Sequence, residues 1–296
     1  MTVKSTEPDS GGLSRRAVLK AGLHTGIGAG FATGLVTGFA LAVRPISAQT
    51  IRTPEAGLVT GDFTVTRGGD RVPYYLARPE GAGPFPAVIV IHEIFGQHEH
   101  IRDVARRFAH EGYIAAAPEL YFREGGVGHL SSFSAVIAVV RSVPDRQMLD
   151  DLGAVLAAVK ALPECNGKIG ATGFCWGGGA TWLFVADNPG LSAGVAWYGR
   201  LTNWAGGSLR PKNPIDLAAR MNAPVLGLYA EADRGIPPSQ VEAMGKALRR
   251  HGKPHEFHIY PGAPHAFHAD YRPSYRPAAA KDGWKRCLAW FKKYLR

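Results

Sequence analysis

Cysteine is scarce in this chain of 296 residues, which contains only Cys165, Cys175 and Cys287. No two of them stand close enough in the sequence to act as the paired ligands of a structural zinc site. The 11 histidines also lack the helical two-histidine spacing of zinc proteases. We therefore expect a protein that needs neither a metal ion nor another cofactor.

The chain also lacks internal repeats, an interdomain linker and a recognisable nucleic-acid-binding module. Its formal net charge is +10, but the basic residues are spread out, and their concentration near the C-terminus fits a solvated helix face. Nucleic acid is therefore not an expected partner. The roughly 250 residues that follow the first 48 are enough for one large domain with a substantial core.

Apolar segments with the character of β-strands alternate with longer segments typical of helices. Strands are expected near residues 59–66, 73–78, 86–92, 113–117, 168–174, 192–198, 224–230 and 255–260, and helices near 99–111, 145–161, 178–188, 239–251 and 277–294. This order predicts an α/β fold with a mostly parallel eight-stranded sheet and helices on both faces. The connections at 122–142 and 199–220 are expected to form a cap or lid.

The segment Gly173-Phe174-Cys175-Trp176-Gly177 is the most informative part of the sequence. An apolar run before it predicts a buried strand, and a Gly-rich apolar run after it predicts a helix. A cysteine at the tip of such a turn, with glycine two residues before and two after it, is the pattern of the nucleophile elbow of α/β-hydrolases. The alternative is a small buried cysteine in a Gly-rich turn.

Two further loops supply the partners that a nucleophile requires. Asp233 follows a predicted strand at 224–230, and His265 follows the predicted strand at 255–260. Because parallel strands end at one edge of a sheet, both side chains should lie near Cys175. The order nucleophile, acid, histidine is that of α/β-hydrolases. A helix cap for Asp233 and an ordinary loop position for His265 are the alternatives.

The chain resembles dienelactone hydrolases (carboxymethylenebutenolidases and their broader relatives), a cysteine-using branch of the α/β-hydrolase superfamily. The resemblance covers about residues 55–295 and is carried by His92-Glu93-Ile94-Phe95-Gly96, Pro118-Glu119-Leu120-Tyr121, the elbow, the Asp233 loop and Gly262-Ala263-Pro264-His265-Ala266-Phe267. It implies an α/β-hydrolase fold in which Cys175 is the nucleophile, His265 the base and Asp233 the carboxylate that orients the base.

The resemblance also implies roles around this triad. Glu93 is expected to lie near the thiol and to help control its ionisation, the alternative being a surface acid that begins the next helix. The backbone N–H groups of Trp176 and Ile94 are expected to stabilise the oxyanion. The candidate substrate-binding residues are Tyr121, Arg123, Phe267 and Arg272.

These residues predict a cysteine-dependent hydrolase of a small carboxylic ester or lactone. A substrate carboxylate is not specifically expected, because Ala269 occupies the position, four residues after the histidine, at which dienelactone hydrolases hold that group with an arginine. A thioesterase or acyltransferase with the same triad, and a non-catalytic binding protein with a hydrolase fold, are the alternatives.

The first 48 residues differ from the rest of the chain. Ser14-Arg15-Arg16-Ala17-Val18-Leu19-Lys20 precedes a weakly hydrophobic, Gly-rich stretch that ends near Ala48. This pattern predicts a twin-arginine export signal at 1–48, a periplasmic domain at 49–296 and the export machinery as a transient partner. An uncleaved membrane anchor is the alternative. An oxidising compartment would also permit a disulfide between Cys165 and Cys287, which the sequence neither requires nor excludes.

Overall fold

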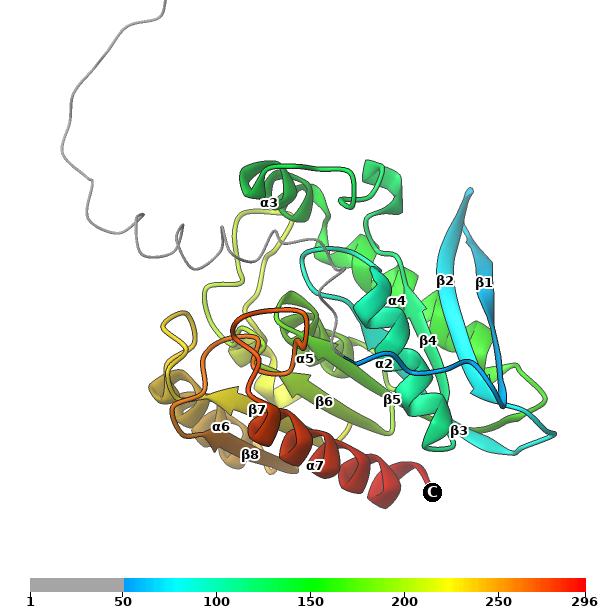
Figure 1. Cartoon of the computed structure of the whole chain (residues 1–296). Coiled ribbons are helices and arrows are strands. Elements are labelled where there is room, and N and C mark those ends of the chain that lie inside the picture. The colour runs from blue at the N-terminus through cyan, green and yellow to red at the C-terminus, as the bar shows by residue number, and fades with distance from the viewer. Residues whose placement is uncertain (1–50) are drawn as a thin grey trace, which may run out of the picture. The chain divides into compact units, whose positions relative to one another are not determined.

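The computed structural model describes residues 51–296, so the predicted export signal lies outside the described residues. Eight strands form one sheet in the order β1-β2-β4-β3-β5-β6-β7-β8 (Figure 1). Their bounds are β1 Leu58–Arg67, β2 Asp70–Pro79, β3 Phe85–Ile91, β4 Ile114–Pro118, β5 Cys165–Phe174, β6 Ala193–Trp197, β7 Val225–Ala230 and β8 His255–Tyr260. Strands β3 to β8 pair in parallel, whereas β1 and β2 are antiparallel.

Helices cover both faces of this sheet (Figure 1). Helices α2 and α7 pack on one face, and α4, α5 and α6 pack on the other. The helices are α2 Glu99–His110, α3 Phe133–Ser142, α4 Asp145–Lys160, α5 Trp176–Asp187, α6 Pro238–Arg250 and α7 Pro277–Leu295, with short 3₁₀ helices η3 Phe122–Glu124 and η4 Pro214–Arg220. The predicted α/β-hydrolase fold is therefore confirmed.

The central strands were recognisable because they are covered on both sides. In β3 every residue from 86 to 91 is buried, and all of β7 is buried. Strands of a parallel sheet read as continuous apolar runs for this reason. Helix α5 begins two residues earlier than expected. The sequence did not predict its first turn, because that turn contains glycines, which have poor helix propensity. Helix α3 lies inside the expected cap and was not predicted as a helix.

All three cysteines are free thiols in the structure. Cys287 is fully buried on the inner face of α7, whereas Cys165 is half-buried at the start of β5 and its sulfur accepts a hydrogen bond from the N–H of Gly167. The disulfide left open by the sequence is therefore not formed here.

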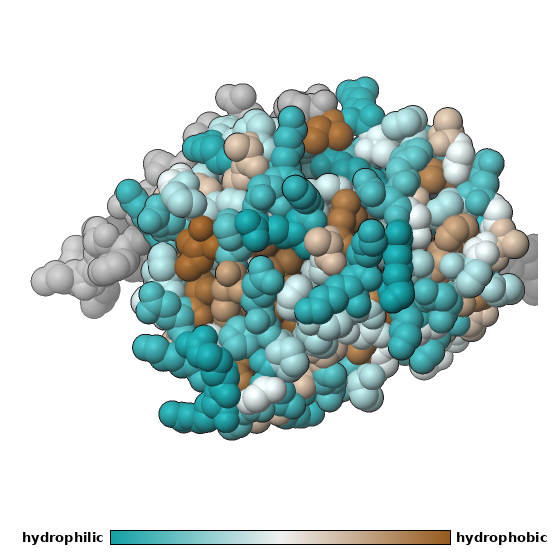
Figure 2. Space-filling model, turned by 90° about the horizontal axis from the view of Figure 1, so that it is seen from below, coloured by the Kyte–Doolittle hydropathy of each residue, from teal (hydrophilic) through white to brown (hydrophobic). Residues whose placement is uncertain are grey.

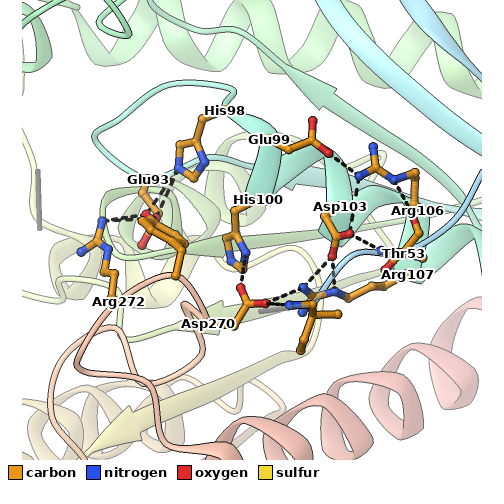
Figure 3. Close-up of polar contacts among 12 residues, drawn as sticks. Thr53, Glu93, His98, Glu99, His100, Asp103, Arg106, Arg107, Asp270 and Arg272 are labelled. Carbon is orange, nitrogen blue, oxygen red and sulfur yellow. Dashed lines mark hydrogen bonds and ion pairs between the residues drawn. The ribbon is translucent and has the colours of Figure 1, made fainter. Parts of the chain in front are cut away.

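The segment just after residue 50 is tied to the domain through its backbone. The N–H of Ile51 donates to Asp270 at 2.8 Å, and the N–H of Thr53 donates to the buried Asp103 at 2.6 Å. Arg106 in turn donates to the carbonyl of Thr53 (Figure 3). The first described residues thus contact both α2 and the loop that follows β8.

The face shown in Figure 2 is covered mostly by hydrophilic residues, with hydrophobic ones in small groups between them. Among residues 51–296, no helix has the length and hydropathy needed to cross a bilayer.

Candidate active site

Cys175 is the single residue between β5 and α5. Its φ of 55° and ψ of −113° lie outside the regions that residues other than glycine usually adopt. Two backbone hydrogen bonds hold it there: its N–H donates to Trp197 at 3.0 Å, and its carbonyl accepts from Gly179 at 3.2 Å. The strained turn projects the side chain beyond the carboxyl end of the sheet, as a nucleophile elbow requires.

The glycines around the elbow are needed because the backbone packs closely. A Cβ on Gly173 would lie 2.1 Å from the carbonyl oxygen of Gly177. A Cβ on Gly177 would lie 2.4 Å from the carbonyl oxygens of both Ile91 and His92. Only glycine permits β3, β5 and α5 to approach this closely.

We expect Gly177→Ala to lower the free energy of unfolding by at least about 2 kcal/mol, because rigid backbone must move to admit the methyl group. Gly69→Ala is the matched control, since nothing lies within 4 Å of its Cβ position, and should change stability by less than about 0.5 kcal/mol. Chemical denaturation of both variants checks this. Equal stability of the two variants would show that the elbow can accommodate a methyl group at residue 177.

Asp233 and His265 meet at the same edge of the sheet, from the loops after β7 and β8. Nδ1 of His265 lies 2.5 Å from Oδ2 of Asp233. The other oxygen of Asp233 accepts from the N–H groups of Gly235 and Ile236 at 2.9 and 3.2 Å. Burial raises the pKa of Asp233, but the hydrogen bond from His265 and the backbone donors outweigh it, so the pKa is lowered. Asp233 is therefore a carboxylate that fixes the imidazole.

The helix-cap alternative for Asp233 does not hold. Helix α6 begins at Pro238, and its N-terminal cap is Pro237, which makes no side-chain hydrogen bond. Asp233 instead closes the turn that precedes the helix.

The side chain of Cys175 lies close enough to His265 to influence its ionisation. Burial lowers the pKa of His265, but the charge of the Cys175 sulfur and the hydrogen bond to Asp233 raise it to about 10. The ring of Tyr198 lies edge-on to the imidazole, with 5.1 Å between the ring centroids. The three residues Cys175, His265 and Asp233 thus form the contiguous arrangement that nucleophilic catalysis needs.

Two backbone N–H groups near the carboxyl end of the sheet are unpaired. Within residues 51–296, no hydrogen bond is made by the N–H of Trp176 or by that of Ile94. Trp176 is the first residue of α5, so its N–H has no intrahelical acceptor and points, with the positive end of the helix dipole, out of the helix. Both predicted oxyanion donors are therefore available.

Glu93 is fully buried in a cluster of polar side chains. Its Oε2 accepts a hydrogen bond from the hydroxyl of Tyr271, and lies 3.4 Å from a guanidinium nitrogen of Arg272 and 3.5 Å from Nε2 of His98 (Figure 3). Burial raises the pKa of Glu93, but the charge of Arg272 and the bond with His98 outweigh it, so the pKa lies well below its usual range. The surface-acid alternative is thus excluded, and the influence on the thiol stays a prediction.

Glu93→Gln should destabilise the fold by about 3 kcal/mol or more at pH 7, because it leaves the buried guanidinium of Arg272 without a counter-charge. A carboxylate with a lowered pKa stabilises the fold fully above its unfolded pKa, 4.5, and loses this contribution as the pH falls. The difference between wild type and variant should therefore shrink below pH 4.5 in denaturation experiments. Glu99→Gln, at a side chain that is 55% exposed, should cost less than about 1 kcal/mol. If Glu93→Gln lowered the free energy of unfolding no more than this control, the role of the buried ion pair in stability would be contradicted.

The four predicted substrate-binding residues separate into two groups. Tyr121 is fully buried beside the elbow, with its ring centroid 5.3 Å from that of Trp176. Arg272 is joined to Glu93, and its guanidinium lies over the ring of Phe95. These two lie against the elbow and the Glu93 cluster, and their contact with a substrate stays a prediction.

The expectations for Arg123 and Phe267 need correction. Arg123 forms ion pairs with Asp151 and Asp70, each at 2.6 Å, so its charge is already neutralised by the fold. Phe267 is fully buried and packs against Tyr198 and Tyr260 as part of the core. Phe267 is therefore closed to a substrate, and the charge of Arg123 is engaged by two carboxylates.

Sequence reasoning missed the roles of Tyr198, Tyr271 and His98. The sequence pattern singled out none of these three residues. Tyr198 directly follows β6, at the same sheet edge as Cys175, and this position was the available signal. Within residues 51–296, no group of three or more His, Cys, Asp or Glu side chains is arranged to hold a metal ion.

The fold and the elbow together define an α/β-hydrolase. The chain belongs to the dienelactone hydrolase family, whose sequence model matches residues 72–295. It is 50% identical over 285 residues to a "Putative carboxymethylenebutenolidase" of Methylorubrum extorquens, covering 95% of this chain and 94% of the relative. It is 49% identical over 259 residues to a protein of the same name from Escherichia coli, covering 86% and 95%.

A solved structure agrees with this assignment. A "Putative Dienelactone Hydrolase" from Klebsiella pneumoniae superposes with a TM-score of 0.77 at 48% identity, covering 80% of this chain and 99% of that one. The predictions that the chain is a member of this family and a hydrolase are confirmed.

Proposed function

We propose that the protein hydrolyses a small carboxylic ester or lactone with Cys175 as its nucleophile. The observation that carries this proposal is that Cys175, His265 and Asp233 meet at one edge of the sheet, with Nδ1 of His265 2.5 Å from Asp233, where two backbone N–H groups are unpaired. A carboxymethylenebutenolide, from which the relatives take their name, contains a lactone ring, which supports this class of substrate for the present chain.

The chemistry follows from the geometry. His265 takes the proton of the Cys175 thiol as the sulfur attacks the carbonyl carbon. The negative oxygen of the tetrahedral intermediate accepts hydrogen bonds from the N–H groups of Trp176 and Ile94. The C–O bond then breaks, and the imidazolium of His265 gives its proton to the leaving oxygen. A water molecule, deprotonated by His265, attacks the resulting thioester. The carboxylic acid leaves, and the proton returns to the sulfur.

Mass spectrometry tests the covalent step directly. After brief incubation with p-nitrophenyl butyrate and quenching in acid, we expect the protein to gain one butyryl group, located on the peptide that contains Cys175. The variant Cys175→Ala should gain none. Acylation of another residue, with Cys175 unmodified, would remove the basis of the proposal.

The alternatives use the same groups. A thioesterase or acyltransferase would form the same acyl-enzyme and differ in the leaving group or acceptor, so a panel of esters, lactones and thioesters separates them by kcat/KM. A binding protein without catalysis would have no use for the open donors beside a thiol that lies close to His265.

We further propose that residues 1–48 direct the domain at 49–296 to the periplasm. The support is the twin-arginine pattern at Arg15 and Arg16, followed by the weakly hydrophobic stretch. Cell fractionation of wild type and of a variant in which both arginines are lysine tests this, since the variant should stay in the cytoplasm.

A further inference from the structure

A cavity of about 480 Å³ lies beyond the carboxyl ends of β3 and β4, which pair in parallel. Ligand sites in proteins commonly have this volume. Its lining comes from the loops after these two strands and includes Phe95, Gln97, His98, Glu119, Phe122 and residues 125–128. Phe95 directly follows Ile94, whose N–H is a predicted oxyanion donor, so the cavity begins one residue from the place of the proposed reaction.

Glu119 is the one acidic residue of this lining, and its side chain is 21% exposed. Its two oxygens accept hydrogen bonds from the backbone N–H groups of Gln97 at 2.7 Å and of Tyr121 at 2.9 Å. A carboxylate oxygen has two lone pairs, so each of these oxygens can accept a further donor. The carboxylate is therefore fixed in place by the backbone and can still bind a ligand.

The negative charge of Glu119 has no positive partner among residues 51–296. The one basic group within ion-pair distance is Nε2 of His92, at 3.8 Å. This nitrogen accepts the N–H of Leu120 at 3.1 Å, and Nδ1 lies 2.6 Å from the carbonyl oxygen of Glu93, so the proton of the ring is on Nδ1. Burial lowers the pKa of His92, in agreement with a neutral ring. The charge of Glu119 is thus left for a ligand to satisfy.

The outer wall of the cavity consists largely of glycine backbone. Nothing lies within 4 Å of a Cβ built on Gly125, Gly126 or Gly128. The N–H groups of Gly125 and Gly126 donate inside the turn, at 3.2 and 2.9 Å, but among residues 51–296 no donor reaches the carbonyl groups of these two glycines. The side chain of Gln97 already makes two hydrogen bonds within the protein. The wall therefore offers more acceptors than donors, and a matching ligand must bring donors.

Two arginines limit the charge that a ligand of this cavity can carry. The guanidinium of Arg272 lies 4.8 Å from the ring centroid of Phe95, and that of Arg123 lies 4.3 Å from the ring centroid of Phe122. These positive charges oppose a cationic ligand, and the carboxylate of Glu119 opposes an anionic one. An uncharged group rich in hydroxyls meets both conditions, because its O–H groups donate and its C–H groups can pack on the two rings.

We propose that this cavity is a subsite for an uncharged, polyhydroxylated part of the substrate, a polyol or sugar portion, whose hydroxyl groups donate to Glu119 and to the open glycine carbonyls. The inference rests on the proposed function, because it assigns that part to the ester or lactone that Cys175 attacks. Hydrogen bonds to an ionised group are stronger than those between neutral groups, so Glu119 is the specificity residue of the subsite. It takes no part in bond breaking.

Two pairs of substrates that differ only in their hydroxyl groups test this subsite. They are 2,3-dihydroxypropyl butyrate with propyl butyrate, and ribono-1,4-lactone with γ-valerolactone. In at least one pair, Glu119→Gln should raise KM for the hydroxylated member about 10-fold or more, leave its kcat within about 3-fold and leave kcat/KM for the other member within about 3-fold. The control Glu231→Gln removes an exposed carboxylate that also accepts a backbone N–H, and should leave all values within about 3-fold.

Gly128→Leu is a second variant, which leaves Glu119 and its hydrogen bonds in place. Its side chain has free space and narrows the cavity, so it should also lower kcat/KM for the hydroxylated member relative to its partner. An unchanged ratio in both variants, or equal loss on both members of each pair, would overturn the subsite.

Should wild type hydrolyse none of the four compounds, the proposed function fails, and the subsite is judged by calorimetry on Cys175→Ala with the two lactones. Binding of ribono-1,4-lactone alone, lost in the double variant with Glu119→Gln, supports the subsite. Equal binding of both lactones, or binding of neither, overturns it.

Discussion

Cys175→Ala is expected to lower kcat for ester hydrolysis by about 10⁴-fold or more, because no other group can form the acyl-enzyme. In the structure the charge of the Cys175 sulfur helps to raise the pKa of His265, whose other side is held by Asp233 at 2.5 Å. Stopped-flow or spectrophotometric assays with p-nitrophenyl esters measure the loss. The substrate KM should change little, since the methyl group of alanine occupies part of the same space.

Cys165→Ala is the matched control for this loss. Cys165 is also a free thiol, but it lies at the opposite, amino-terminal end of β5. Its replacement should leave kcat within about 2-fold. Cys175→Ser distinguishes sulfur chemistry from mere occupancy, because a hydroxyl must be deprotonated by His265 before it can attack. If the activity of Cys175→Ala were close to that of wild type, the assignment of Cys175 as the nucleophile would be wrong.

Asp233→Asn should lower kcat by about 10²–10⁴-fold with little change in stability. The amide can still accept the bonds from Gly235 and Ile236 through its oxygen, so the loop keeps its shape. It cannot supply the negative charge that orients His265. Because that carboxylate contributes to raising the pKa of His265 to about 10, the imidazole of the variant should lose its proton at a lower pH. NMR titration of the ring, together with the pH dependence of kcat, measures both effects.

Glu231→Gln serves as the control for Asp233→Asn. Glu231 lies on the same loop, is exposed, and accepts a hydrogen bond from Gly262 that an amide oxygen can replace. It should leave kcat and the titration of His265 nearly unchanged. If both variants behaved alike, the effect of Asp233 would be one of loop charge rather than of contact with the imidazole.

The sequence predicted those parts of the site that depend on local pattern. Gly173 and Gly177 indicate the elbow in the sequence, because no larger residue fits between β3, β5 and α5. Asp233 and His265 follow buried apolar strands. Parallel strands bring their carboxyl ends to one edge of the sheet, whatever the conformation of the loops. The triad was therefore predictable without knowledge of any loop path.

Residues whose role depends on loop paths were not predictable. Arg123 and Arg272 looked equivalent in the sequence, yet Arg123 is neutralised by Asp151 and Arg272 is buried against Glu93. The difference comes from side chains that meet across long separations in the chain.

The anchoring of Ile51 and Thr53 constrains how this enzyme can be shortened. Their amides donate to Asp270 and Asp103, and Oδ1 of Asp270 also lies 2.8 Å from Nδ1 of His100 on α2 (Figure 3). Asp270 stands five residues beyond His265, on the same loop. Trimming past Ile51 would thus remove one of the hydrogen bonds that hold the loop carrying His265, so recombinant versions and N-terminal fusions should retain this residue and its neighbours.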